Sequence, residues 1–354
     1  MKWLNWTLAI VLLLSPLALL EVSSRWWIVR YADPLQRARR ILTLDDELGW
    51  IARSNLNLMF EGKRLFTDTR GLRVPSNVKN DLDTKQILVL GPSSAFGWGV
   101  NCEEAWPALI DGNTVLNASQ VGYSIVQGQK LYERLRADGL SGIKTVIIAY
   151  GVNDIDHFRF FDQTNLSDVE YFKQMGKNEL LGGIYASGIL STLARGYQEA
   201  AIYFHCGYPQ RPMQRVGAEA FSMHLKGLIL ELRKNKIGVL LVNSANAINV
   251  EPNNSKAEES DRLYEESARA SALNQCARSR DLFFQAKKFE SWRVIRDIDR
   301  INLAIQKTGT EMNVPVANIS GLEQKSFFVD PIHFSAEGHR LVADVIKSAL
   351  MELN

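Results

Sequence analysis

Short apolar runs alternate with longer amphipathic stretches from residue 86 onward. The apolar runs, which predict buried strands, cover residues 87–90, 114–117, 145–150, 237–243 and 314–317. Apolar residues at helical spacing predict helices over 126–138, 218–234 and 292–311 and again after residue 335. Near-continuous apolar strands separated by helices are typical of a parallel sheet covered on both faces. We therefore predict one α/β domain over residues 85–354.

Two stretches interrupt this alternation and predict insertions. Residues 155–214 are rich in aromatic side chains. A structureless loop of that length is unusual inside a domain, so we expect helices that form a cap near the strand ends. Residues 251–290 begin with a polar, charged and alanine-rich stretch, which predicts a solvated, partly helical surface insertion.

The N-terminal segment is the longest apolar run of the chain. Residues 3–20 contain only three polar side chains, which is near the lower length limit for a transmembrane helix and longer than most signal-peptide cores. Paired tryptophans beside arginines at 25–30 are typical of a membrane interface. We predict an uncleaved transmembrane anchor over residues 1–30, with cleavage near Val22-Ser23-Ser24 as the alternative.

Two rules disagree on the side of the membrane that the domain occupies. Arginines after the apolar run outnumber Lys2 and the amino terminus, and the positive-inside rule alone would then keep the domain in the cytoplasm. A lone N-terminal hydrophobic segment, however, usually directs export. We expect the domain on the exported, periplasmic or extracellular, side.

Residues 31–84 connect the anchor to the domain. Leu35–Leu44 predicts a short basic helix, residues 46–50 a turn, and Phe66–Val74 a small β element. The many apolar and aromatic residues favour a segment packed on the domain, with a loose juxtamembrane linker as the alternative.

Composition narrows the function classes. The 354 residues are 46% hydrophobic and 23% charged with a net charge of +2, so a nucleic-acid partner is not expected. The three cysteines, at positions 102, 206 and 276, lie far apart without a Cys-x-x-Cys pair, so we expect neither a zinc site nor another metal or cofactor. A disulfide between Cys206 and Cys276 stays open for an exported domain.

A pair of serines follows the first predicted strand of the domain. Gly91-Pro92 ends the apolar run, and Ser93 and Ser94 come next, where a helix could begin. Open α/β sheets bind ligands at the carboxyl ends of their strands, where helix N-termini supply free N–H groups. This position suits a nucleophile, although a serine that merely caps a helix would look the same.

An aspartate and a histidine lie three residues apart near the C-terminus. Pro331 favours an extended Asp330, and the turn that follows can bring its carboxylate toward His333. Such a carboxylate fixes the imidazole tautomer, and a base oriented in this way is what a serine nucleophile requires. The alternative is a turn aspartate beside an exposed histidine. Ser335 is the predicted N-cap of the last helix.

Four segments occur in the order and approximate spacing of a known family. They are Gly91-Pro92-Ser93, Asn117-Ala-Ser-Gln-Val-Gly122, Gly151-Val-Asn153-Asp154 and Asp330-Pro-Ile-His333. Over about residues 85–350 the chain thereby resembles the SGNH, or GDSL-type, hydrolases. The resemblance implies a three-layer α/β/α flavodoxin-like fold.

The resemblance also implies roles for individual residues. Ser93 would be the nucleophile, His333 the base and Asp330 the group that orients it. The oxyanion hole would combine the N–H groups of Ser93 and Ser119 with the side chain of Asn153.

The chain departs from the family pattern at two positions. Pro92 stands where the family usually has aspartate, and Ser119 where it usually has glycine. A backbone N–H survives any substitution except proline, so Ser119 could still donate. Pro92 removes a donor and fixes a dihedral beside the nucleophile, and Ser94 is the alternative nucleophile.

The implied activity is hydrolysis of an ester-linked acyl group of a lipid or a cell-surface glycan, without a cofactor. Transfer of the acyl group to a sugar hydroxyl, as in an O-acyltransferase, is the alternative within the family. The two departures support a third hypothesis, a catalytically silent, membrane-anchored binding or assembly factor.

Overall fold

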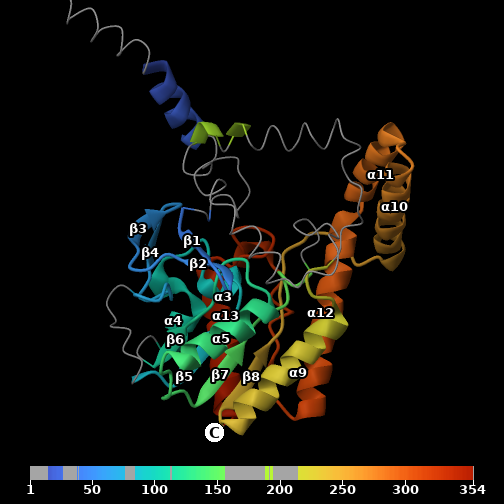
Figure 1. Cartoon of the computed structure of the whole chain (residues 1–354). Helices are drawn as coiled ribbons and strands as arrows, with labels where there is room; N and C mark the ends of the chain where they lie inside the picture. The colour runs from blue at the N-terminus through green and yellow to red at the C-terminus, as the bar shows by residue number, and fades with distance from the viewer. Residues whose placement is uncertain are drawn as a thin grey trace, which may run out of the picture.

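A parallel sheet lies at the centre of the computed structural model, which describes residues 15–26, 38, 40–75, 84–111, 114–155, 188–190, 192–193 and 214–353 (Figure 1). Within these residues the sheet has five strands in the order β6-β5-β7-β8-β9. They are β5 (Ile87–Leu90), β6 (Val115–Asn117), β7 (Thr145–Ile148), β8 (Gly238–Val242) and β9 (Val316–Ala317). The predicted strands and their parallel arrangement are confirmed, with ends displaced by one or two residues.

The strand order places the topological switch point of the sheet at β5. Numbered along the chain, the order is second, first, third, fourth, fifth, which is the flavodoxin-like arrangement. The chain leaves β5 in one direction to reach β6 and returns on the other side to form β7. Ligands of such sheets bind at this switch point, at the carboxyl ends of the strands.

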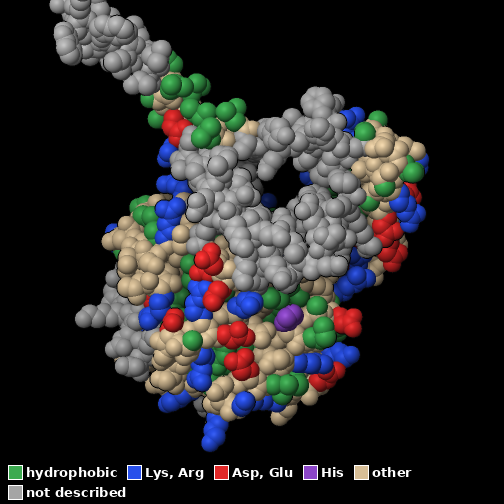
Figure 2. All heavy atoms as spheres, viewed as in Figure 1, with side chains coloured by type: hydrophobic (Ala, Val, Ile, Leu, Met, Phe, Trp, Pro, Cys, Tyr) green, Lys and Arg blue, Asp and Glu red, His purple; other side chains and the backbone are tan. Residues whose placement is uncertain are grey.

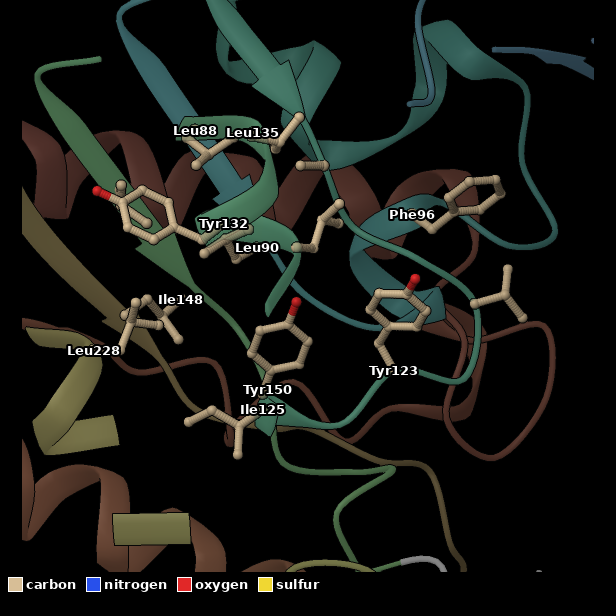
Figure 3. Packing of buried hydrophobic residues seen from close by; sticks show 14 of the residues in the cluster. Leu88, Leu90, Phe96, Tyr123, Ile125, Tyr132, Leu135, Ile148, Tyr150 and Leu228 are labelled. Carbon is tan, nitrogen blue, oxygen red and sulfur yellow. The ribbon is translucent and has the colours of Figure 1, made fainter. Parts of the chain in front are cut away.

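Helices cover both faces of the sheet. The helices of the two layers are α4 (Trp106–Asp111) and α13 (Ala336–Met351) on one face, and α5 (Ile125–Ala137), α9 (Ala218–Lys234) and α12 (Glu290–Met312) on the other. Successive strand residues point to opposite faces. Leu88 and Leu90 of β5 therefore pack with α5 and α9 (Figure 3), whereas Val89 packs with α13. The three-layer α/β/α prediction is confirmed.

The last helix begins where the sequence predicts. Ser335 is the N-cap of α13, and its Oγ accepts the N–H of Gly338 at 3.3 Å. The same helix contributes His339, which is fully buried and whose Nδ1 accepts the N–H of Trp106 at 3.1 Å. This bond joins the start of α4 to α13.

The connector forms two antiparallel hairpins. Strands β1 (Leu42–Asp45) and β2 (Gly49–Ala52) make the first, and β3 (Asn57–Phe60) and β4 (Lys63–Phe66) the second. The helix predicted over residues 35–44 is therefore wrong at its C-terminal end, because residues 42–44 pair with β2. The Asp45 carboxylate accepts the N–H groups of Glu47 and Leu48, which stabilises the turn between β1 and β2.

Buried hydrogen bonds join the connector to the α/β layers. Trp50 donates its Nε1–H to the Val121 carbonyl at 2.7 Å, and the Tyr123 hydroxyl donates to the Trp50 carbonyl at 2.5 Å. The Gln120 side chain accepts from Ala52 N and donates to the carbonyl of Gly71. The buried apolar residues of the hairpins belong to the same cluster as those of α5 and α9.

The second insertion is a pair of helices, α10 (Asn254–Ala272) and α11 (Cys276–Lys288), that extends away from the sheet (Figure 1). Leu263, Tyr264, Phe283 and Ala286 form a small core between them. The helical prediction is confirmed, but the pair is more than a solvated arm. The Asp261 carboxylate of α10 binds Arg293 and Arg296 of α12 at 2.8 and 2.7 Å, which fastens the pair to the domain.

Most of the other insertion, predicted as an aromatic cap over residues 155–214, lies outside the described residues. Among the cysteines, Cys276 is disulfide-bonded and Cys102 is a buried free thiol. Cys206 lies outside the described part of the chain.

Residues 15–26 form a helix that exposes apolar side chains, visible as a hydrophobic stretch in Figure 2. The most exposed are Leu17, Leu19, Leu20, Val22 and Trp26. In the described part of the chain, no helix combines the length and the hydrophobicity that crossing a membrane requires. Residues 1–14, which contain most of the apolar run at residues 3–20, are not described.

The burial of His339 makes its protonation unfavourable. Burial lowers the pKa of His339 to about 3, and the positive charges of Arg73 and His333 contribute in the same direction. An unfolded chain binds a proton on this side chain near pH 6.5. Between these values the unfolded state holds one proton more than the folded state, so the free energy of unfolding decreases as the pH falls.

Replacing His339 by Asn should weaken this pH dependence, because the amide oxygen can still accept the Trp106 N–H but does not titrate. The slope of the free energy of unfolding should fall by up to about 1.4 kcal/mol per pH unit between about pH 4 and 6. Urea unfolding of the wild type and the variant measures it. Near pH 8 the free energies of unfolding of wild type and variant should change with pH at the same rate. Equal slopes between about pH 4 and 6 would contradict the prediction.

Candidate active site

Ser93 is the first residue of the short helix α3 (Ser93–Phe96), which begins directly after β5. The turn between them requires a glycine, since a Cβ at Gly91 would lie 2.7 Å from the Cβ of Ala95 and 3.3 Å from the Oγ of Ser119. Pro92 takes the N-cap position with φ −86° and an extended ψ. Proline adopts this conformation readily, and no intrahelical bond needs its missing N–H there.

His333 joins Ser93 to Asp330. Its Nε2 lies 2.7 Å from the Oγ of Ser93, and its Nδ1 lies 2.7 Å from the Oδ2 of Asp330. Ser93 and His333 are 240 positions apart in the chain and are both buried. With the Nδ1 proton on the aspartate side, Nε2 can accept the serine proton.

The chain around Asp330 forms the turn that the sequence predicts. Oδ1 accepts the backbone N–H groups of Ile332 and His333 at 3.0 and 2.9 Å, while Oδ2 faces the imidazole. Burial by itself raises the pKa of the Asp330 carboxyl, but the hydrogen bond and charge of His333 and the two N–H groups outweigh it and lower the pKa below its ordinary value. The carboxylate is therefore ionised at neutral pH.

Asn153 follows β7 at the same edge of the sheet. Its side-chain amide donates one N–H to the carbonyl of Tyr123 at 3.2 Å, and the side chain is buried. The amide group has a second N–H that can donate elsewhere. The neighbouring Asp154 has a structural contact, because its Oδ1 accepts the N–H of Ile125 at the start of α5.

Ser119 follows β6, but its N–H is already engaged. It donates to the Oδ1 of Asn117 at 3.1 Å, and the residue is fully buried. The Oγ of Ser119 is also buried and has no hydrogen-bond partner within the described residues.

Asn117 ends β6 and Gly122 lies in the loop after it, and neither residue had a predicted role of its own. The Asn117 amide donates to the carbonyl of Ala95 at 3.1 Å and so ties the end of β6 to α3. Gly122 has φ +77°, where glycine is strongly favoured. In the described part of the chain, the N–H groups of Val121 and Gly122 have no acceptor, and Gly122 adjoins Tyr123, which Asn153 contacts. The feature of the sequence that could have singled out Gly122 is the glycine at the end of this loop.

Ser94 faces a different environment from Ser93. It lines a cavity of about 20 Å³ between the sheet and α13, together with Pro92, Ala149, Ile332 and other residues. That volume holds roughly one water molecule. Within the described residues, no group of three or more His, Cys, Asp or Glu side chains could hold a metal ion.

Comparisons with known proteins add structural neighbours. No protein-family model matches the chain, and no curated protein does. Solved structures similar to it include a GDSL-like lipase from Bacteroides thetaiotaomicron, with 13% identity over 76% of this chain and 87% of that one and a TM-score of 0.40. The acetyl xylan esterase AlAXEase is 16% identical over 75% of this chain and 99% of that one, with a TM-score of 0.41. The psychrotrophic esterase EstA from Pseudoalteromonas sp. is 12% identical over 76% of this chain and 97% of that one, with a TM-score of 0.41.

Replacing Asp330 by Asn should slow the reaction of Ser93 with a fluorophosphonate probe by about two to four orders of magnitude, because the neutral amide no longer fixes the tautomer or stabilises the imidazolium. The second-order labelling rate constant at pH 7.5 measures this. Asp344, exposed on α13, supplies the matched control Asp344→Asn, which should label at the wild-type rate. Equal rates for all three proteins would contradict the role of Asp330.

Proposed function

We propose that the protein is a serine esterase of the SGNH, or GDSL, type that cleaves an ester-linked acyl group. The single observation that supports this most strongly is the pair of 2.7 Å contacts from His333, one to the Ser93 hydroxyl and one to the Asp330 carboxylate. A hydroxyl, an imidazole and a carboxylate joined in this order are the parts of a serine hydrolase triad.

In the proposed mechanism, the Ser93 Oγ attacks the carbonyl carbon of the ester while His333 Nε2 takes the hydroxyl proton. Asp330 stabilises the imidazolium that forms. The tetrahedral intermediate then expels the alcohol, whose oxygen receives the proton from His333, and an acyl-Ser93 ester remains. A water molecule next gives a proton to His333 and attacks this ester, and the carboxylic acid leaves as Ser93 recovers its proton.

The negative oxygen of each intermediate needs N–H donors. We propose the N–H of Ser93, the second side-chain N–H of Asn153 and the N–H of Gly122. Gly122 replaces Ser119 in this role because the Ser119 N–H already donates to Asn117 and the Gly122 N–H has no acceptor within the described residues.

The substrate class follows from the proposed location of the site near a membrane. We propose an acyl ester of a lipid or of a cell-surface glycan. A sugar hydroxyl in place of water would make the protein an O-acyltransferase through the same acyl-serine intermediate. Pro92 gives little support to a catalytically silent factor, since it occupies the N-cap of α3, where its missing N–H is not needed.

Replacing Ser93 by Ala should abolish both fluorophosphonate labelling and hydrolysis of a short aryl ester, because no other hydroxyl contacts His333 in the described part of the chain. Ser94→Ala is the matched control and should keep both activities within about threefold, since Ser94 lines the small cavity beside α13 whereas the contact with His333 comes from Ser93. Mass spectrometry of the labelled peptide identifies the modified serine. A folded wild type that neither labels nor hydrolyses would favour the silent factor.

We also propose that an N-terminal anchor holds the domain on the exported side of a membrane. The apolar run of residues 3–20 continues into the helix at 15–26, whose leucines are exposed. The disulfide-bonded Cys276 supports export, since disulfides persist mainly in oxidising compartments.

A phosphatase reporter that is active only after export, fused after Asn354, should be active in cells. The fusion should also stay with the membrane fraction after a carbonate wash, because the anchor is uncleaved. An inactive phosphatase fusion, together with an active fusion to a second reporter that works only in the cytoplasm, would contradict export. An active reporter in the soluble exported fraction would instead indicate cleavage near Val22.

A further inference from the structure

An indole ring covers one face of the His333 imidazole. Trp98 stacks on it with ring centroids 5.7 Å apart and an angle of 30° between the planes. The hydrogen bonds to Ser93 and Asp330 lie in the plane of the imidazole, so they leave rotation about the line between those partners weakly restrained. The indole ring acts perpendicular to that plane. Trp98 is itself buried.

Trp98 is fastened to the nucleophile and to the connector. Its backbone N–H donates to the carbonyl of Ser93 at 3.0 Å. Its ring is packed edge-on by Phe60, the last residue of β3, with centroids 5.1 Å apart and planes at 76°. The second hairpin of the connector therefore reaches the catalytic base through one intervening ring.

Arg73 holds the segment that bears Trp98. Its guanidinium donates to the carbonyls of Phe96 at 2.9 Å, Gly97 at 2.5 Å and Val100 at 2.7 Å, and its side chain is buried. These carbonyls lie on both sides of Trp98 in the chain. A buried cation with several carbonyl acceptors restricts the backbone of residues 96–100, because each lost bond would leave a buried polar group unpaired.

We propose that Trp98 is a positioning residue for His333 and that the connector, through Phe60 and Arg73, sets the place of its ring. Two physical effects follow from the stack. The indole face attracts a cation within about 6 Å and so favours the imidazolium that forms when His333 takes the serine proton. The same contact keeps Nε2 directed at Ser93.

Two other groups contact the imidazole, namely Asp330 on the same turn and Ser93 on α3. The positive charges of His333 and Arg73 also lower the pKa of the buried His339 on α13. The inference rests on the proposed role of His333 as the base, but the position and protonation of the ring can be measured without any substrate.

The test uses nitrogen-15 NMR of the full chain in detergent, with the His333 signal assigned by comparison with His333→Asn. In Trp98→Leu, the pH at which the His333 imidazole is half protonated should fall by about 0.5 to 1 unit. In Trp98→Phe this pH should stay close to that of the wild type, because an aromatic face is still present. Phe60→Leu should cause a smaller shift in the same direction. In the double variant Phe60→Leu/Trp98→Leu the shifts should not add, because both act through one contact.

The second readout is the rate constant of fluorophosphonate labelling, which should fall about 3- to 10-fold in Trp98→Leu and recover in Trp98→Phe. Phe283→Leu removes a buried aromatic ring from the distant α10–α11 core and should change neither readout. An unchanged or raised titration midpoint in Trp98→Leu, or in Phe60→Leu should Trp98→Leu fail to fold, would overturn the proposal. If the midpoint falls in Trp98→Leu but the wild type never labels, the result counts against the esterase function alone.

Discussion

Parallel pairing of β5 with both β6 and β7 is the constraint on which the rest of the structure depends. It aligns the carboxyl ends of three strands, so that the residues after each strand meet at one edge of the sheet. Ser93, the Asn117–Gly122 loop and Asn153 occupy those three positions. The fourth part of the candidate active site is the turn with Asp330 and His333, which lies near the C-terminal end of the chain, just before α13.

The connector packs into the same hydrophobic core as one face of the sheet. Its hairpins share a hydrophobic cluster with α5 and α9, and Trp50, Gln120 and Tyr123 exchange buried hydrogen bonds across the boundary. Each such bond contributes only about 1 kcal/mol net, but breaking one leaves a buried polar group unpaired, at a cost of about 1 to 3 kcal/mol. Loosening the connector would therefore also disturb the loop that supplies the proposed oxyanion donor.

The departures from the family pattern have separate structural consequences. Pro92 fits the N-cap of α3, where its dihedral angle and its missing N–H cause no conflict. Ser119 lies in a fully buried position and directs its N–H to Asn117, and for this reason we propose the Gly122 N–H as the oxyanion donor instead.

The sequence by itself determined the layers and the main chemical groups. Apolar runs with β-branched residues and helical spacing are local signals, and they predict the strands, α9, α12 and α13 within a few residues. The short Asp330-Pro-Ile-His333 turn is equally local, since a carboxylate three residues from an imidazole can reach it without help from the rest of the chain. Local signals failed where pairing decides, as at residues 42–44, which lie in the helix predicted over Leu35–Leu44 but pair as a strand with β2.

Only the tertiary structure decided the contacts between distant segments. It places Ser93, and not Ser94, against His333, because the direction of a side chain at a helix start depends on how α3 sits on the sheet. It also stacks Trp98 on His333 and brings Phe60 and Arg73 to the same place. These pairs are separated by between 23 and more than two hundred positions and have no common spacing. Their proximity arises from packing, which a pattern along the chain does not encode.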